Sequence, residues 1–487
     1  MFFVFTSIFW RQRYTFFIII YYFLFIISYL FIKKYYLCAA MKQQKHLFLL
    51  FAALFVASCH TSTYVQHHRS GPDNIHTGLV SQSEETIVEL PVQTKVEEPR
   101  AVYEAVTGIA ADIDQLLISE DTLLQRSQLG LHVVDLTSAE VLYARNAHQR
   151  MRPASTEKVA TAIAALDLLG PNFSLTTQLL SSAGITGSTL DGDLYLKGVM
   201  DPLLSVADVR SLVSQLQAAG IRTIDGRLIA DGSFKDADEY GWGWCWDDDN
   251  PVLSPLLCSG KPVLVDQLMS ALRAAGITVA RGTSIGKTPA GVRTLASVSH
   301  SLTDVLQPML KESDNLCAEA VFYQLGKAYG IYTSIKETTK SYSRKNAAAA
   351  VSAVINKSHL PVWGGREGSS TVADGSGLSL YNYQTPAAFT CLLAYATTRP
   401  EAILNPLLAA LPIAGVDGTL KSRMSGTAAA ANVRAKTGSV NAVSTLVGYT
   451  TQRSTGHLIA FAIMNQGVER MSDGRNLQDK ICILLSK

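Results

Sequence analysis

Three short motifs stand in one order along the 487-residue chain: Ser155-Thr-Glu-Lys158, Ser313-Asp-Asn315 and Lys436-Thr-Gly438. Each motif has its own structural context. Ser155 precedes an Ala-rich apolar run over 159–169, which predicts a buried helix. Lys436 ends a run that reads as a strand near the C-terminus. The fold of this chain is therefore expected to contain a central buried helix that packs between elements from distant parts of the sequence.

Strands from both ends of the folded part are expected to form one sheet. Alternating and apolar runs predict strands at 130–136, 140–144, 444–450 and 457–464, and a terminal helix from about Asn476. Helical periodicity covers 113–124. Together with the Ala-rich helix, these elements indicate a mixed α/β (α+β) fold with a sheet closed by its two termini.

A second, smaller α/β domain is predicted between the first two motifs, which are 158 residues apart (313 − 155). A faint internal repeat lies in this gap. Leu212–Ile224 and Leu268–Val279 each read as a helix ended by a glycine and followed by a strand. We therefore expect an inserted domain over 175–295 and a main domain over 110–174 and 296–487.

Two further strings imitate the motifs. Ser284-Ile-Gly-Lys287 lies among glycines and a proline, a composition typical of a turn, and Ser439-Val-Asn441 resembles the second motif. Because only Ser155 opens a buried helix, we take Ser155 as the functional copy.

The net charge and the spacing of the histidines give no support to nucleic-acid binding or to metal binding. The net charge of +2 does not suggest a nucleic-acid partner, and none is expected. The ten histidines show no spacing typical of zinc ligands, so no metal and no cofactor is expected.

The N-terminal part is read as an export signal. A basic stretch over 41–46, an apolar stretch over 47–57 and Val56-Ala-Ser-Cys59 resemble a lipoprotein signal peptide over 41–59. Cys59 would then carry the lipid and anchor the protein to a bacterial envelope membrane, with the folded part in the periplasm. A plain secretory signal is the alternative. Residues 1–40 are interpreted as upstream sequence from a misassigned start, or else as an extra hydrophobic segment. The polar stretch over 60–109 is interpreted as a flexible tether that reaches roughly 35–40 Å.

Cysteine usage leaves one pairing open. Cys38 and Cys59 fall in the leader, and five cysteines remain in the exported part. Cys245 and Cys258 are the only close pair, and both a disulfide and two thiols are compatible with the sequence. Buried thiols are expected for Cys317, Cys391 and Cys482.

Beyond the three motifs, further segments resemble the low-molecular-mass class C penicillin-binding proteins of the D-alanyl-D-alanine carboxypeptidase/endopeptidase type, over about residues 110–487. The segments that carry this resemblance are Gly192–Gly198 with Asp201-Pro202, Gly241–Trp244, Asp374–Ser379 with Asn382 and Thr385-Pro386, Gly415–Leu420 and Arg434–Gly438. The resemblance implies a penicillin-binding-protein/β-lactamase-like transpeptidase fold, an antiparallel sheet flanked by helices with an inserted domain. It also implies a serine-type D-Ala-D-Ala carboxypeptidase that acts on peptidoglycan stem peptides through an acyl-enzyme and is inhibited by β-lactams. A further domain that relatives often carry within the insertion is expected to be absent or much reduced.

The first motif supplies the predicted nucleophile and base. Ser155 would attack the substrate, and Lys158, one helical turn on, could accept its proton only when neutral. Burial and the second cation Lys436 would both lower the pKa of Lys158. Ser313 would relay the proton to the leaving amine, unless its motif serves only as a helix N-cap.

The other motif residues are expected to bind substrate. Asn315 would hold the substrate amide, and Lys436 with Thr437 suits a free carboxylate. Gly438 would leave room along the strand edge, and the backbone N–H groups of Ser155 and Ser439 would form the oxyanion hole.

Acidic residues of the inserted domain are candidates for reading the side-chain amine of the stem peptide: Asp236, Asp238 and Glu239. The alternative is that these three acids are solvent-exposed loop residues with no role in binding. Trp242, Trp244 and Trp246 with Asp247–Asp249 read either as a binding surface or as a packed loop.

Two other functions remain open. A serine β-lactamase shares the motifs but keeps the first two much closer together. A non-catalytic wall-binding lipoprotein would keep the fold without the chemistry.

Overall fold

The computed structural model describes residues 108–333, 342–359, 365–366 and 368–487. The predicted upstream segment, signal peptide with Cys59, and most of the tether lie outside the described residues. No helix of the described part has the length and apolarity that a membrane span requires.

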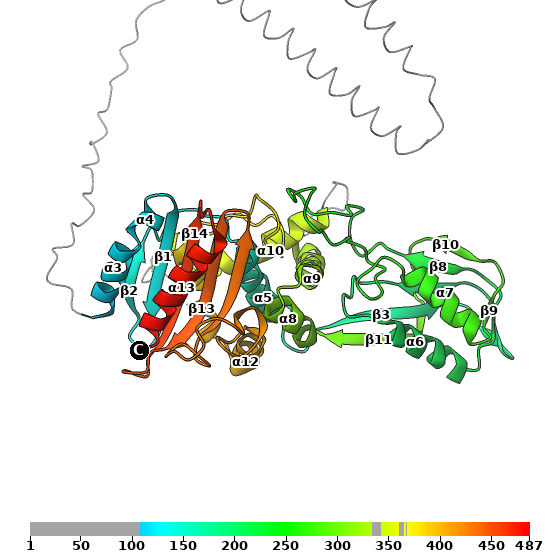
Figure 1. The fold of residues 1–487 in the computed structure, drawn as a ribbon. Helices are drawn as coiled ribbons and strands as arrows, with labels where there is room; N and C mark the ends of the chain where they lie inside the picture. Colours follow the sequence, from blue (N-terminus) through cyan, green and yellow to red (C-terminus); the bar gives the residue numbers. More distant parts are fainter. Residues whose placement is uncertain (1–107, 334–341, 360–364, 367) are drawn as a thin grey trace, which may run out of the picture. The chain divides into compact units, whose positions relative to one another are not determined.

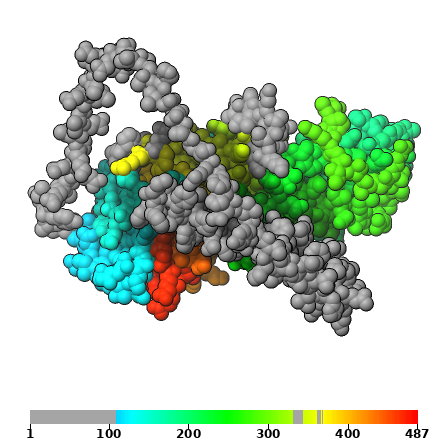
Figure 2. Space-filling view, turned by 90° about the horizontal axis from the view of Figure 1, so that it is seen from above, coloured from blue at the N-terminus to red at the C-terminus, as the bar shows by residue number. Residues whose placement is uncertain are grey.

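The main sheet joins the two ends of the described chain. Its strand order is β12-β13-β14-β1-β2, and all neighbours are antiparallel. The bounds are β1 Gln128–Asp135, β2 Glu140–Arg145, β12 Arg434–Val440, β13 Val443–Thr451 and β14 Leu458–Gln466. The N-terminal strand β1 pairs with β14 along its whole length, which confirms a sheet closed by the termini. In Figure 2 the blue-to-cyan and red segments accordingly lie side by side.

Alternation along the strands gives the sheet two apolar faces. In β14, Ile459, Phe461 and Ile463 enter one core, and Ala460, Ala462 and Met464 enter the other. The first face is covered by α3 Ile109–Ser119, α4 Asp121–Leu124 and α13 Met471–Leu485. The terminal helix begins five residues before the predicted start.

Six helices of the described part supply the apolar core on the other face of the sheet, and several of them lie to the right of the sheet in Figure 1. They are α5 Glu157–Leu168, α8 Leu302–Lys311, α9 Asn315–Thr333, α10 Tyr342–Ser358, α11 Pro386–Thr397 and α12 Glu401–Ala410. The Ala-rich helix α5 is buried on nearly all sides. Small side chains let the neighbouring helices approach α5 closely, so the sequence prediction of a central buried helix is confirmed.

The segment between α5 and α8 builds two further sheets. One has the order β10-β8-β6-β3-β11, and the other β4-β5-β7-β9. The bounds are β3 Ser174–Ser181, β4 Ile185–Thr186, β5 Thr189–Leu190, β6 Leu194–Lys197, β7 Thr223–Ile224, β8 Leu228–Asp231, β9 Thr278–Val279, β10 Thr283–Ile285 and β11 Arg293–Ser301. These strands and helices α6 Val206–Ala218 and α7 Leu264–Ala274 share a separate apolar core. The predicted domain limits fall at the start of β3 and inside β11, and the division into domains remains our proposal.

The internal repeat is visible in the structure. Helices α6 and α7 are followed by Gly220 and Gly276, both with positive φ, and then by β7 and β9, which pair in parallel. Ser284, predicted to lie in a turn, lies instead in the edge strand β10. Three residues were too few for the sequence to reveal that pairing.

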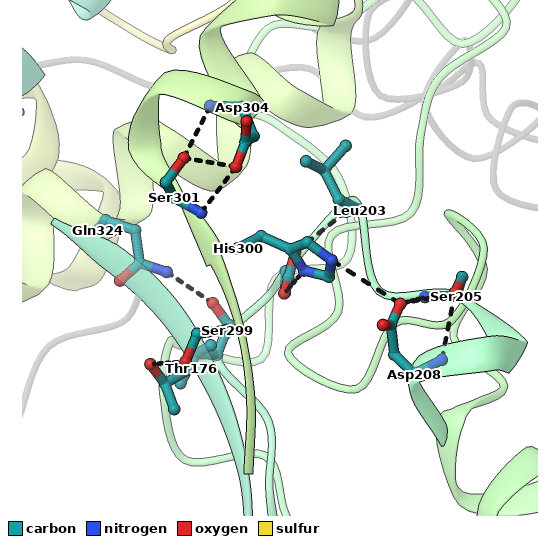
Figure 3. A network of polar contacts seen from close by, with 11 residues as sticks. Thr176, Leu203, Ser205, Asp208, Ser299, His300, Ser301, Asp304 and Gln324 are labelled. Atoms are coloured by element: carbon teal, nitrogen blue, oxygen red, sulfur yellow. Dashed lines mark hydrogen bonds and ion pairs between the residues drawn. The ribbon is translucent and has the colours of Figure 1, made fainter. Parts of the chain in front are cut away.

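A polar network lies where β11 runs into α8 (Figure 3). His300 Nδ1 lies 2.7 Å from Asp201 Oδ2, and its Nε2 lies 3.8 Å from Asp208 Oδ2. Ser301 and Asp304 form a capping box at the start of α8. This network ends the strand and starts the helix that leads to the second motif.

Candidate active site

The first motif lies where a 3₁₀ turn, η1 Ala154–Thr156, passes into α5. Ser155 is half-buried on this turn, and Lys158 lies one turn further with its side chain fully buried. Lys158 Nζ lies 3.0 Å from Ser155 Oγ. The predicted nucleophile and base are therefore in hydrogen-bond contact.

Lys158 Nζ has two further partners, Asn315 Oδ1 and the carbonyl oxygen of Ser376, each at 2.7 Å. Both are acceptors, and they use two N–H groups of the lysine. The Ser155 hydroxyl can donate as well as accept. A neutral Lys158 amine therefore satisfies all three contacts when its lone pair accepts a hydrogen bond from the Ser155 hydroxyl.

Burial lowers the pKa of Lys158 to about 8. The neighbouring carboxylates of Asp374, Glu319 and Asp314 act in the opposite direction, because they stabilise the ammonium form. The balance leaves about a tenth of the amine neutral at pH 7, far more than an exposed lysine has, and a general base needs this form.

The second and third motifs meet at a second lysine. Lys436 Nζ lies on β12, is fully buried, and donates to Ser313 Oγ at 2.9 Å and to the Thr437 carbonyl at 2.8 Å. Burial and the charge of Lys158 hold the pKa of Lys436 well below its usual value. A bound carboxylate would favour the ammonium form again.

Ser313 is not the cap of α9. It has a φ of 63°, and the residue after it, Asp314, accepts from the backbone N–H of Cys317 at 2.7 Å. The second motif therefore does cap α9, through Asp314 and not through Ser313, and the relay role of Ser313 stays a prediction. The capping by Asp314 leaves the Ser313 hydroxyl available for Lys436.

The third motif lies on β12, the edge strand of the main sheet. A Cβ at Gly438 would lie 2.1 Å from Thr445 Oγ1 and 2.7 Å from the Pro153 carbonyl, so glycine lets β12 pack against the turn of Ser155. Thr437 Oγ1 donates to Thr419 Oγ1 at 2.8 Å, and Ser439 is exposed. An edge strand beside the nucleophile offers backbone groups to an extended peptide.

The acidic residues proposed for the stem peptide are not joined to this cluster. Asp236 Oδ1 lies 3.2 Å from Lys235 Nζ, and Asp236 Oδ2 accepts from the backbone of Ser343. Its side chain is 7% exposed, and it already faces an ammonium group. Asp238 is exposed, and its role stays a prediction.

The tryptophan segment divides into packed and exposed residues. Trp244 Nε1 donates to Asp374 Oδ2 at 2.8 Å, and Trp242 stacks on Tyr381 with 4.4 Å between ring centroids. Trp246 is 93% exposed. At Trp244 the packed-loop interpretation is confirmed.

Three buried carboxyl groups near Lys158 were given no role from the sequence: Glu157, Glu319 and Asp374. Asp374 accepts four hydrogen bonds, from the backbone of Gly377 and Ser379 and from the side chains of Asn382 and Trp244. Asp374 lies in a segment that carries the family resemblance, whereas the signal for Glu319 was an acid within the apolar run Cys317-Ala-Glu319-Ala-Val-Phe322.

In the described part of the chain no cluster of histidine, cysteine and acidic side chains could hold a metal ion. Cys245 and Cys258 are both thiols, so the open question of their pairing is answered against a disulfide. Cys317, Cys391 and Cys482 are buried, as expected.

A family model described as D-Ala-D-Ala carboxypeptidase 3 (S13) family matches residues 109–256 and 260–487. D-alanyl-D-alanine carboxypeptidase DacB of Haemophilus influenzae is 26% identical over 424 residues, which cover 70% of this chain and 85% of the relative. D-alanyl-D-alanine carboxypeptidase of an Actinomadura species is 28% identical over 460 residues, which cover 74% of this chain and 81% of the relative.

The fold is also similar to that of a crystal structure of penicillin binding protein 4 from Haemophilus influenzae complexed with a β-lactam. The TM-score is 0.61 at 25% sequence identity, and the match covers 76% of this chain and 99% of that chain. The match covers nearly all of that penicillin-binding protein, so the expected transpeptidase-like fold is confirmed.

Proposed function

Since the chain belongs to the D-Ala-D-Ala carboxypeptidase 3 (S13) family, we propose that it removes the terminal D-Ala of peptidoglycan stem peptides through an acyl-enzyme on Ser155. The observation that carries this proposal is the contact of Lys158 Nζ with Ser155 Oγ in a fully buried environment. A base with a lowered pKa next to a hydroxyl is the arrangement that activates serine.

In the first step Ser155 Oγ attacks the carbonyl carbon of the penultimate D-Ala while Lys158 accepts the hydroxyl proton. The C–N bond to the terminal D-Ala breaks, and the leaving amine takes a proton through Ser313, which Lys436 holds in place. Water then hydrolyses the ester on Ser155 and releases the shortened stem peptide. Backbone N–H groups of Ser155 and Ser439 would stabilise the oxyanion.

Substrate would lie along the edge of β12. The terminal carboxylate suits the Lys436 ammonium with the hydroxyls of Thr437 and Ser439, and Asn315 would hold the peptide amide. A β-lactam presents a carboxylate and a strained amide in a similar arrangement. Inhibition by β-lactams is therefore part of the proposal, and it is supported by the complex of the similar Haemophilus protein.

Release of D-Ala from a pentapeptide that ends in D-Ala-D-Ala tests the activity. The parent protein should release one D-Ala per peptide, and Ser155→Ala should release none above background. Equal release by both proteins would contradict the role of Ser155. The same assay with a D-Ala–diaminopimelate cross-linked dimer measures the endopeptidase reaction.

A serine β-lactamase remains the second candidate because it would use the same cluster. A penicilloyl adduct on Ser155 that persists for many minutes would exclude it, whereas rapid turnover of benzylpenicillin would support it. The contacts of Lys158 with Ser155 and Asn315, and of Lys436 with Ser313, argue against a wall-binding protein without catalysis.

Export and lipid anchoring are a separate proposal. Its support is the signal-like sequence over 41–59 and the cell-wall substrate expected for the family, and it assigns the folded part to the periplasm. Metabolic labelling with a radioactive fatty acid tests it. The parent should incorporate label and sediment with membranes, whereas Cys59→Ala should do neither.

A further inference from the structure

A buried carboxyl group on α9 holds the backbone that contacts Lys158. The Glu319 side chain is 1% exposed, and its Oε1 accepts from the backbone N–H groups of Gly375 and Ser376 at 3.1 and 2.9 Å. The carbonyl of the same Ser376 accepts from Lys158 Nζ at 2.7 Å. Glu319 therefore binds the N–H groups of a short peptide segment, and the Ser376 carbonyl of the same segment binds the proposed base.

The turn over 374–379 packs closely against its neighbours on two sides. A Cβ at Gly377 would lie 1.9 Å from the Ala154 carbonyl, and one at Gly375 would lie 2.5 Å from Phe322 Cβ. The turn is thus held between α9 and the turn of Ser155. Asp374 accepts hydrogen bonds from the N–H groups of Gly377 and Ser379 in this turn. The N–H groups of Gly375 and Ser376 bind Glu319 instead.

We propose that Glu319 is a positioning residue for Lys158, which directs the Ser376 carbonyl onto Lys158 Nζ and whose charge sets how readily Lys158 gives up its proton. This inference rests on the proposed function, because it concerns the base of that reaction. Glu319 does not touch the substrate or Ser155 in this account. It acts only through the peptide segment and through its field.

The charges around the two groups give the direction of the effect. Lys158 is faced by Glu319, Asp314 and Cys317 from the α9 side, by Asp374 from the turn and by Lys436 from β12. Glu319 is faced by Asp374, Lys158 and Tyr323. Burial and Asp374 raise the pKa of Glu319 to about 8, so Glu319 and Lys158 titrate over one pH range. Ionised Glu319 stabilises the Lys158 ammonium and delays formation of the neutral base.

The test is the pH dependence of acylation by benzylpenicillin, followed as the growth of the penicilloyl mass in the full chain. Glu319→Gln keeps an oxygen that can accept from both amides but removes the charge. Its acylation rate should rise with pH about one pH unit earlier than that of the parent. Glu319→Ala removes the acceptor, so its rate at the high-pH plateau should fall by about tenfold or more.

Glu401→Gln, an exposed change in the first turn of α12, is the matched control and should reproduce the parent profile. An unshifted rise for Glu319→Gln, or a shift to higher pH, would overturn the inference, even if thermal stability falls. If Glu319→Ala does not fold, the Gln profile alone decides. A parent protein that forms no adduct would contradict the proposed function instead, so the two failures are distinguishable.

Discussion

Among single residues, the proposed chemistry depends most on Lys158. Its Nζ contacts Ser155, the second motif and a backbone carbonyl, and in the neutral amine the lone pair faces the Ser155 hydroxyl. Burial makes the neutral form accessible, with a pKa of about 8. The acylation rate should therefore increase as pH rises toward about 8, because the proposed base is the deprotonated lysine.

Replacing Lys158 with arginine keeps a cation but prevents deprotonation. We expect Lys158→Arg to be acylated by benzylpenicillin about 10²–10⁴ times more slowly than the parent. Lys327→Arg, on the exposed side of α9, is the control and should be acylated like the parent. A Lys158→Arg protein with the parent rate would show that this lysine is not the base.

Close packing at Gly438 can be tested separately. A methyl group there would overlap Thr445 Oγ1 and the Pro153 carbonyl, which forces β12 away from the turn of Ser155. Gly438→Ala should lower the free energy of unfolding by about 1–3 kcal/mol and slow acylation. Gly232→Ala has open space around its Cβ and should change neither quantity. Urea titration measures the difference.

The proposed nucleophile, the proposed base and the two partner motifs could be picked out because their local patterns are typical of this chemistry. The contacts of Glu319 and Asp374 could not, although Asp374 lies in a segment that carries the family resemblance. Each is a single acid whose partners come from elsewhere in the chain, and only the folded chain brings their carboxylates to the 375–376 and 377–379 amides. Asp236 is the opposite case. The sequence suggests that it binds the stem peptide, whereas in the folded chain its carboxylate lies beside the Lys235 ammonium.

At the scale of elements, the segment between β8 and α7 contacts the turn that orients the base. Trp244 donates to Asp374, and Trp242 accepts through its backbone carbonyl from Ser379 Oγ at 2.7 Å. The sequence indicated a packed loop or a binding surface, but periodicity carries no information on what an irregular segment packs against. The helices and long strands were predictable because their apolar patterns extend over many residues, whereas the three-residue strand β10 was missed.

Trp244→Phe tests this link between segments. Phenylalanine fills most of the same space but leaves Asp374 Oδ2 with one donor fewer, so stability should fall by about 1–3 kcal/mol. Trp246→Phe, at a side chain that is 93% exposed, is the matched control and should have little effect. Equal denaturation midpoints for the parent and Trp244→Phe would show that the indole hydrogen bond does not support the turn.

In the molecule as a whole, the main sheet and the helices packed on it keep several ionisable groups away from water. Burial raises the pKa of Glu157 to about 8 in the folded state, against an ordinary value of 4.5. The folded state then binds this proton more tightly than the unfolded state does. Its contribution to stability is lost as pH rises from about 4.5 to about 8.

Glu157→Gln removes that dependence. Its melting temperature should therefore fall less than that of the parent between pH 5 and pH 8, as measured by calorimetry. Glu401→Gln should keep the parent slope, because its side chain is exposed. Parallel slopes for the parent and Glu157→Gln would mean that Glu157 is ionised throughout this range.

Acylation of Ser155 is the step from which the other proposed roles follow, and the intact-protein mass after brief exposure to benzylpenicillin reports on it. The part of the chain from about residue 100 onward should gain one penicilloyl group that persists, and Ser155→Ala should gain none. An adduct on both proteins, or on neither while the parent also releases no D-Ala from a pentapeptide, would contradict the account.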